Sequence, residues 1–233
     1  MSAFGSPGAD FRVEDLRIYV HDVTLLGADG SRTAIALDQD GAFQRESLAL
    51  LDFEDGGTGC PGGTAATHTA VTGRAPAGAY TGVEFVIGVP PDLDHLDAST
   101  ALPPLEDTTL WWVWRSGYKY LRLEGTANGS VGFPFHLGAT GCPGASPVSP
   151  PSGPCTQPNL STVTLRGFDP TAGTITVDAG ALLATTNLGV NASGSAQGCQ
   201  SDPDDTDCGP VFASIGLPFG GAAPGPQVLF HAP

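Results

Sequence analysis

The sequence has little positive charge. Nine Lys and Arg residues stand against twenty-four Asp and Glu residues, which gives a formal net charge of −15. Nucleic acids and anionic membrane surfaces attract basic proteins, so the charge argues against both as partners. A metal cation or a basic protein fits this balance better, although negative charge also serves solubility alone.

Long apolar runs are missing as well. No stretch approaches the roughly 18 apolar residues of a membrane-spanning helix, so we expect no membrane span. Residues 1–10 lack the basic and apolar regions of a signal peptide. We expect residues 1–10 to be a disordered N-terminal segment, with Met1 not native if a leader has been removed. Residues 11–233 are expected to form a single domain.

The motifs of several enzyme classes are absent. The sequence contains no Gly-x-Ser-x-Gly nucleophile elbow, no Walker-type phosphate loop and no dinucleotide fingerprint. Carboxylates concentrate in turns such as 202–205, which are usually solvated and bind calcium only in a minority of cases. The three Asp residues around His95 would suit a secreted metal enzyme, which we keep as a minor alternative. We expect a binding protein and not an enzyme.

None of the five cysteines belongs to a CxxC pair, so a thiolate zinc site or a thioredoxin-like motif has little support. Cys142 and Cys155 flank a run rich in Pro, Gly and Ser, and Cys199 and Cys208 flank an acidic loop. We predict one disulfide within each pair, which indicates an oxidising compartment. Cys60 is left without a partner.

The composition favours β structure. Hydrophobic residues make up 40% of the chain, enough for a sizeable core, while 33 Gly and 21 Pro leave little room for long helices. We predict an all-β fold: a single antiparallel β-sandwich or barrel-like domain with long disulfide-tied loops and one or two short helices.

Turn residues divide the sequence into short runs rich in β-branched and aromatic residues. The predicted strands are 16–26, 33–37, 47–53, 67–71, 81–87, 108–114, 118–123, 131–137, 161–166 and 174–177. Asn128-Gly129 is the strongest hairpin signal, because a type I′ turn needs positive φ at both central residues. It should pair 131–137 with 118–123, and further hairpins are expected for 16–26 with 33–37 and for 161–166 with 174–177. Short helices are predicted at 179–186, with Asp178 as N-cap, and at 212–217.

All three tryptophans lie in the segment Trp111-Trp112-Val113-Trp114. On a strand, Trp112 and Trp114 would share one face, and an aromatic core strand is the simplest interpretation. His95 lies in a polar loop before this segment, and His136 lies on the predicted hairpin strand after it. Because imidazole binds zinc, copper, nickel and iron, this spacing alone does not select a metal.

Several short strings, taken in order, resemble one family. They are LDFEDG at 51–56, YTGV at 80–83, IGVP at 87–90, WVW at 112–114, GYKY at 117–120, FHLG at 135–138, PN at 158–159 and GFDP at 167–170. Together with the four paired cysteines, they span nearly the whole chain. The sequence resembles the MbnP-type proteins, the group named for a metallo-mystery pair and a four-cysteine motif.

The resemblance implies a periplasmic protein that acts with MbnH, a dihaem c-type cytochrome of the bacterial peroxidase family. It implies that the first Trp of the WxW motif, Trp112, is oxidised to kynurenine by this partner, with Trp114 as its companion. The modified protein then binds one copper ion, expected as Cu(I), in copper homeostasis.

The chemistry of the side chains agrees with this expectation. An indole offers a metal no lone pair, whereas kynurenine has an aryl amine and a ketone. We therefore predict that copper is bound by kynurenine derived from Trp112 together with His95 and His136, with His21 as a less favoured candidate. The alternative is a secreted β-sandwich binding module with no metal, in which the tryptophans pack in the core or line a binding face.

Overall fold

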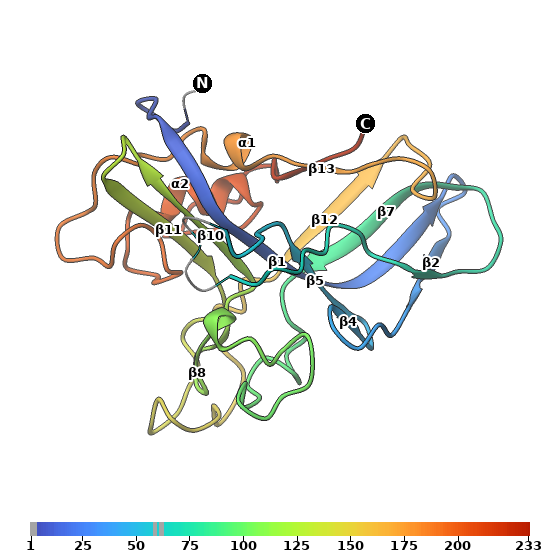
Figure 1. Ribbon diagram of the computed structural model, residues 1–233, viewed down its shortest axis with the longest axis horizontal. Helices are drawn as coiled ribbons and strands as arrows, with labels where there is room; N and C mark the ends of the chain where they lie inside the picture. Colours follow the sequence, from blue (N-terminus) through green and yellow to red (C-terminus); the bar gives the residue numbers. More distant parts are fainter. Residues whose placement is uncertain (1–3, 58–59, 61–62) are drawn as a thin grey trace.

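The computed structural model describes residues 4–57, 60 and 63–233, and Figure 1 shows its arrangement. Its central element is β1 (Phe11–Gly27), a strand of 17 residues. Along its length it pairs with β10 (Leu121–Ala127), β5 (Leu48–Asp52), β7 (Tyr80–Ile87) and β2 (Arg32–Ala34). The eight-stranded sheet is completed by β11 (Val131–Leu137) on β10, β12 (Ser161–Arg166) on β7 and β4 (Gln44–Arg45) on β5. All these pairings are antiparallel, so the predicted all-β fold is confirmed.

The remaining elements are short. Three two-stranded sheets pair β3 (Ala36–Leu37) with β6 (Gly73–Arg74), β8 (Trp111–Val113) with β9 (Gly117–Tyr118), and β13 (Thr176–Val177) with β14 (Phe230–His231). The helices are η1 (Thr108–Leu110), α1 (Ala179–Leu183) and α2 (Cys208–Ser214). In the part of the chain that the structure describes, no helix has the length and apolar character needed to cross a bilayer.

Several local predictions are confirmed. Asn128 and Gly129 both have positive φ, 51° and 73°, and they connect β10 to β11 as a hairpin. The hairpin at the start of the chain forms between β1 and β2. Asp178 caps α1, because its carboxylate accepts a hydrogen bond of 2.8 Å from the backbone N–H of Ala181.

Both predicted disulfides are present, Cys142–Cys155 and Cys199–Cys208. Cys60 is a free, buried cysteine.

Other predicted pairings are wrong. Segments 161–166 and 174–177 do not form a hairpin, since β12 pairs with β7 and β13 pairs with β14. The reason is burial: alternate residues of β12 are buried, and pairing with β7 lets them extend the core. Segment 67–71 is not a strand and makes only a single bridge, between His68 and Asp52. The second helix begins at Cys208 and not at residue 212.

The tryptophan segment also differs from the predicted continuous strand. Residues 108–110 form the 3₁₀ turn η1, and β8 covers only Trp111–Val113, so Trp114 lies beyond the strand in a turn. The predicted strand 118–123 is interrupted between β9 and β10. The strict alternation expected for Trp112 and Trp114 therefore does not extend across the whole segment.

Residues 4–10, for which disorder was expected, pack onto the domain. Phe4 forms a β-bridge with Ala9, and its ring lies 5.7 Å from that of Phe11. The backbone N–H of Ser6 donates to the carbonyl of Thr186. Residues 1–3 lie outside the described residues.

The two faces of the sheet at β1, β10 and β11 have different chemistry. One face is apolar and packs against α2, where the rings of Phe135 and Phe212 lie 6.4 Å apart. On the other face the strand register places Arg17, Arg122 and His136 in one row across the three strands. Figure 1 shows β8 in a lobe beyond the sheet, formed with neighbouring long loops.

Arg17 is the centre of a buried ionic cluster on this face. Its side chain is 0% exposed, and it donates to Asp15 at 3.0 and 2.6 Å and to Asp107 at 2.6 Å. Asp52 and Glu54, in the LDFEDG string, are also buried. Removing one member of such a cluster leaves unpaired buried charge, so the cluster fixes how the segment around Asp107 sits on the sheet.

The buried carboxyl of Asp52 should make stability depend on pH. Burial raises the pKa of Asp52 from 3.8 to about 6, because a charge is unfavourable there. The folded state therefore holds this proton more tightly than the unfolded state, and the resulting stability is lost as pH rises through about 6. This difference corresponds to about 3 kcal/mol.

Asp52→Asn should remove this dependence while keeping an acceptor for the backbone N–H of Glu54. Urea denaturation at pH 4 and pH 7 should show that the wild type loses about 2 kcal/mol of stability relative to the variant, the part of this difference that falls between these two pH values. Parallel pH profiles for the two proteins would contradict the assignment.

Candidate functional site

Trp112 lies over the end of β11. Its ring centroid is 6.4 Å from that of the His136 imidazole, and the two planes are inclined by 55°. Gly138 permits this position, because a Cβ atom there would lie 2.4 Å from Cζ3 of Trp112. Trp111, by contrast, packs against the hydrophobic core. The structure thus distinguishes the two adjacent tryptophans: Trp112 is the one that meets a histidine.

His136 has one ring nitrogen fixed and one free of partners. Its Nε2 lies 2.6 Å from Oε1 of Glu124, and since an ionised carboxylate can only accept, Nε2 carries the hydrogen. Nδ1 is buried and has no hydrogen-bond partner among the described residues. Burial lowers the pKa of His136, with Glu124 acting in the opposite direction, so the ring tends to be neutral. A neutral ring in this tautomer has a lone pair on Nδ1.

Glu124 is itself held by a cation. Arg122 donates to its two carboxylate oxygens at 2.9 and 3.0 Å. Burial alone would raise the pKa of Glu124, but the hydrogen bonds from His136 and Arg122 hold it well below its usual value. Glu124 therefore stays ionised and continues to accept from His136.

The same charged network holds the turn that leads into the tryptophans. Nε of Arg122 is 3.1 Å from Asp15, which pairs with Arg17, and Arg17 in turn pairs with Asp107. Asp107 is the N-cap of η1 and accepts from the backbone N–H of Thr109 at 2.8 Å. One ionic network thus orients His136 and positions the segment from which Trp112 extends.

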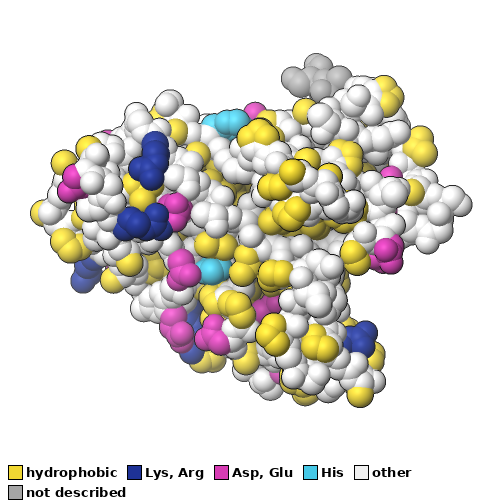
Figure 2. All heavy atoms as spheres, turned by 180° about the vertical axis from the view of Figure 1, so that it is seen from behind, with side chains coloured by type: hydrophobic (Ala, Val, Ile, Leu, Met, Phe, Trp, Pro, Cys, Tyr) yellow, Lys and Arg dark blue, Asp and Glu magenta, His cyan; other side chains and the backbone are white. Residues whose placement is uncertain are grey.

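Trp112 can be reached from solvent. Its half-buried side chain lines an open hollow of about 510 Å³ on the surface. The hollow is also lined by Arg115, Ser116, Thr140, Cys142, Gln200 and Asp202. Acidic side chains are spread over several parts of the face shown in Figure 2.

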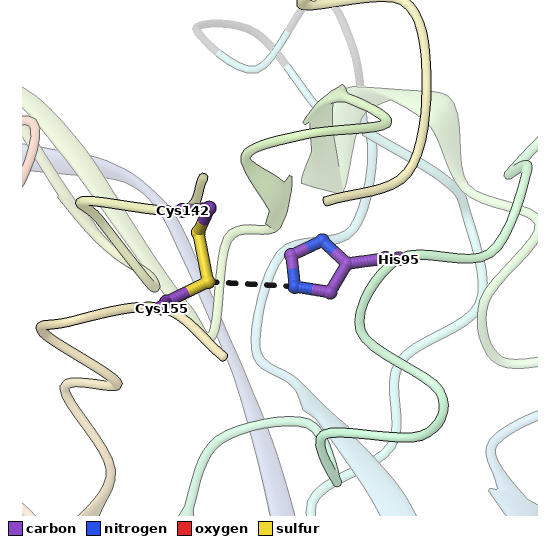
Figure 3. A group of neighbouring side chains, drawn as sticks. All are labelled: His95, Cys142 and Cys155. Carbon is purple, nitrogen blue, oxygen red and sulfur yellow. Dashed lines mark hydrogen bonds between the residues drawn. A yellow bond between two sulfur atoms is a disulfide. The ribbon is translucent and has the colours of Figure 1, made fainter. Parts of the chain in front are cut away.

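His95 contacts the tryptophan segment in a different way. Its Nδ1 lies 3.0 Å from the carbonyl oxygen of Trp114, which can only accept, so Nδ1 carries the hydrogen. Nε2 faces Cys155, with the sulfur at 3.6 Å (Figure 3). It also lies 3.5 Å from Oδ2 of Asp94. His95 therefore approaches the backbone at the end of the segment, and in the neutral ring the lone pair lies on Nε2, next to the disulfide.

His21 is buried on the part of β1 that pairs with β5 and β7. Arg17 is the β1 residue that the strand register aligns with Arg122 and His136, and His21 lies four residues further along β1. Its Nδ1 is 3.0 Å from the carboxylate of Asp22. No contact brings His21 to Trp112 among the described residues, and a metal role for it stays a prediction, as it does for His95 and His136.

Sequence reasoning missed Glu124. The signal was available in the hairpin register: once Asn128-Gly129 pairs β10 with β11, Arg122 stands opposite His136 and Glu124 lies two residues further along. Diagonal neighbours of this kind are within reach of long side chains.

The fold and the site can now be compared with known proteins. The family model of MbnP matches residues 2–201. The chain belongs to the MbnP family. The structure of MbnP from Methylosinus trichosporium matches it with a TM-score of 0.84 and 30% sequence identity, over 99% of this chain and 90% of that chain. No protein with a curated description matches the sequence. The resemblance to the MbnP family is confirmed.

This MbnP-family chain has a second hollow, away from the tryptophans. It has a volume of about 560 Å³ and is lined mainly by apolar residues of β1, β5 and β7 and of segments 69–71 and 170–177. A metal-independent binding module, the alternative predicted from sequence, would place its ligand there.

Proposed function

We propose that this MbnP-family protein binds one copper ion, as Cu(I), between His136 and a kynurenine formed from Trp112, and that it is not an enzyme. The observation that carries the proposal is the buried, unpartnered Nδ1 of His136 beside the indole ring. A buried polar atom without a partner is costly unless a ligand uses it. Imidazole nitrogen is a suitable copper ligand, and Cu(I) accepts a low coordination number.

The surroundings of His136 fit a metal ligand. Metal-bound histidines commonly donate their other ring N–H to a carboxylate, which fixes the tautomer and raises the basicity of the ligating nitrogen. Glu124 occupies this place. Copper would supply a soft cation at Nδ1, while the protein holds the imidazole in one orientation.

The indole of Trp112 must be converted to kynurenine before it can act as a copper ligand. In the described residues, three His, Cys, Asp or Glu side chains bring their ligand atoms together in one group, His95 with Cys142 and Cys155, and there both sulfur atoms are in a disulfide. Kynurenine would add an amine or ketone ligand from the position that already faces His136. His95 and His21 remain proposed additional ligands; His95 contacts the tryptophan segment through Nδ1, while its Nε2 faces the Cys142–Cys155 disulfide.

We also propose an MbnH-like dihaem enzyme of the c-type cytochrome peroxidase family as the partner that oxidises Trp112, and the periplasm as the compartment. The open hollow beside Trp112 supports access from outside. The two disulfides support an oxidising compartment. We further propose a role in copper homeostasis, which a site for a single Cu(I) ion supports.

Expression with and without the dihaem partner tests this proposal. Intact mass should show, only with the partner, one oxygen atom gained and one carbon atom lost at Trp112, together with a new near-ultraviolet absorbance. The modified protein should then bind one Cu(I) tightly, whereas the unmodified protein should bind it weakly. Equally tight loading of both samples would overturn the proposal and leave an ordinary histidine site.

A further inference from the structure

The two disulfides differ in their surroundings. Cys199 and Cys208 are both fully buried, whereas Cys142 and Cys155 are partly exposed. Only the second pair has an imidazole next to it among the described residues: Nε2 of His95 lies 3.6 Å from the sulfur of Cys155 (Figure 3). The ligand atoms of His95, Cys142 and Cys155 all lie within 4.8 Å of one another.

We propose that the Cys142–Cys155 disulfide, once opened by a dithiol reductant, forms with His95 a second metal site of two thiolates and one imidazole that takes Cu(I). The reductant supplies two electrons and two protons, which break the S–S bond to give two thiols, and it becomes a disulfide itself. Binding of Cu(I) then releases the two thiol protons. Thiolates are the soft ligands that select Cu(I).

His95 is already oriented for this site. Its Nδ1–H donates to the carbonyl of Trp114, so in the neutral ring the lone pair lies on Nε2, the nitrogen that faces the sulfur of Cys155. This is the arrangement by which a backbone acceptor fixes the tautomer of a metal-binding histidine. Its side chain is 17% exposed, which leaves an entry path for the ion. The carboxylate of Asp94, 3.5 Å from Nε2, adds negative charge beside the cation.

The two cysteines should stay together after reduction. Thr140 and Gln157, just outside the disulfide loop, form a β-bridge with hydrogen bonds of 2.8 and 3.1 Å in both directions. The disulfide spans only 13 residues and joins no strands of the main sheet. Opening it therefore leaves the sheet intact and the two thiols facing His95.

Cys60 does not compete for this role. Burial, with Glu54 acting in the same direction, raises the pKa of its thiol to about 12, so it stays protonated at neutral pH. In addition, Cys60 is a thiol both before and after reduction, so any copper that it binds is the same in the two samples and does not contribute to the difference between them.

The test uses the full chain expressed without the dihaem partner, so that Trp112 is unmodified in every sample. The protein is treated mildly with a dithiol under anaerobic conditions and then desalted. Alkylation of one portion of this sample should label Cys142 and Cys155 before Cys199 and Cys208. Titration with Cu(I) against a chromogenic chelator should show one additional equivalent in the reduced protein and a thiolate-to-copper band in the near ultraviolet. The result does not depend on kynurenine, so it can succeed or fail separately from the function proposed above.

Two variants separate a built site from simple thiol chemistry. His95→Gln keeps both cysteines and should weaken the additional Cu(I) by about tenfold or more. His231→Gln, at an exposed position on β14, should have no effect. No additional copper in protein whose Cys142–Cys155 bond is shown to be open, or equal affinity in His95→Gln and wild type, would overturn the proposal. So would opening of Cys199–Cys208 first.

Discussion

Replacing Trp112 with phenylalanine should give a folded protein that binds no copper tightly, even when it is made together with the dihaem partner. Phenylalanine keeps an aromatic ring over Gly138 and beside His136, so most of the packing is retained. It cannot be converted to kynurenine and offers no lone pair. The expected result is an unchanged mass after co-expression and the loss of the single tight Cu(I) equivalent, measured by intact mass and chelator competition.

Trp114→Phe is the matched control. Trp114 lies outside β8, and its backbone carbonyl, which contacts Nδ1 of His95, is retained by the substitution. This variant should still be modified at Trp112 and still bind copper. If Trp112→Phe binds copper as tightly as the modified wild type, the kynurenine site does not exist.

Glu124→Gln should weaken copper binding by about 10–100-fold without removing any proposed ligand. A neutral amide accepts less strongly from Nε2 of His136, and it can also present its N–H group, in which case the ring proton moves to Nδ1. Nitrogen-15 spectra of the histidine ring should report this change of tautomer directly in the metal-free protein. A purely structural effect would leave the tautomer as it is.

Two comparisons complete this experiment. His136→Gln should cost more affinity than Glu124→Gln or His95→Gln, because it removes the nitrogen with the free lone pair. Glu84→Gln changes a carboxylate on β7 that pairs with Arg32 and Thr164, away from the site, and should not alter copper binding. Equal copper affinity in Glu124→Gln and wild type would show that Glu124 does not orient the ligand.

Local sequence signals predicted much of the fold. The Asn128-Gly129 turn, the cap at Asp178 and the two short disulfide loops each depend on residues close together in the chain. The errors concern partners that are distant in sequence. Segment 161–166 has the composition of a strand, but its pairing with β7 depends on which sheet edge buries its apolar residues.

At the candidate site, too, the local features were predicted from the sequence and the contacts between distant residues were not. Trp112 and His136 were found because the motif and the hairpin are local. The difference between Trp111 and Trp112 depends on η1 and on the buried pair of Arg17 with Asp107, which are 90 residues apart. Nothing near the tryptophans in the sequence indicates this contact.

The length of β1 also determines when the chain can fold. Phe11 at its start is opposite Ala127, and its second half joins β7, which is in turn completed by β12 ending at Arg166. Topologies dominated by such distant pairings fold slowly, on a scale of milliseconds to seconds. Until β10 has been synthesised, the first half of β1 has no β10 to pair with. This largely buried strand then exposes an apolar edge, and such edges promote aggregation. Fragments that end before β10 should therefore depend on chaperones to remain soluble.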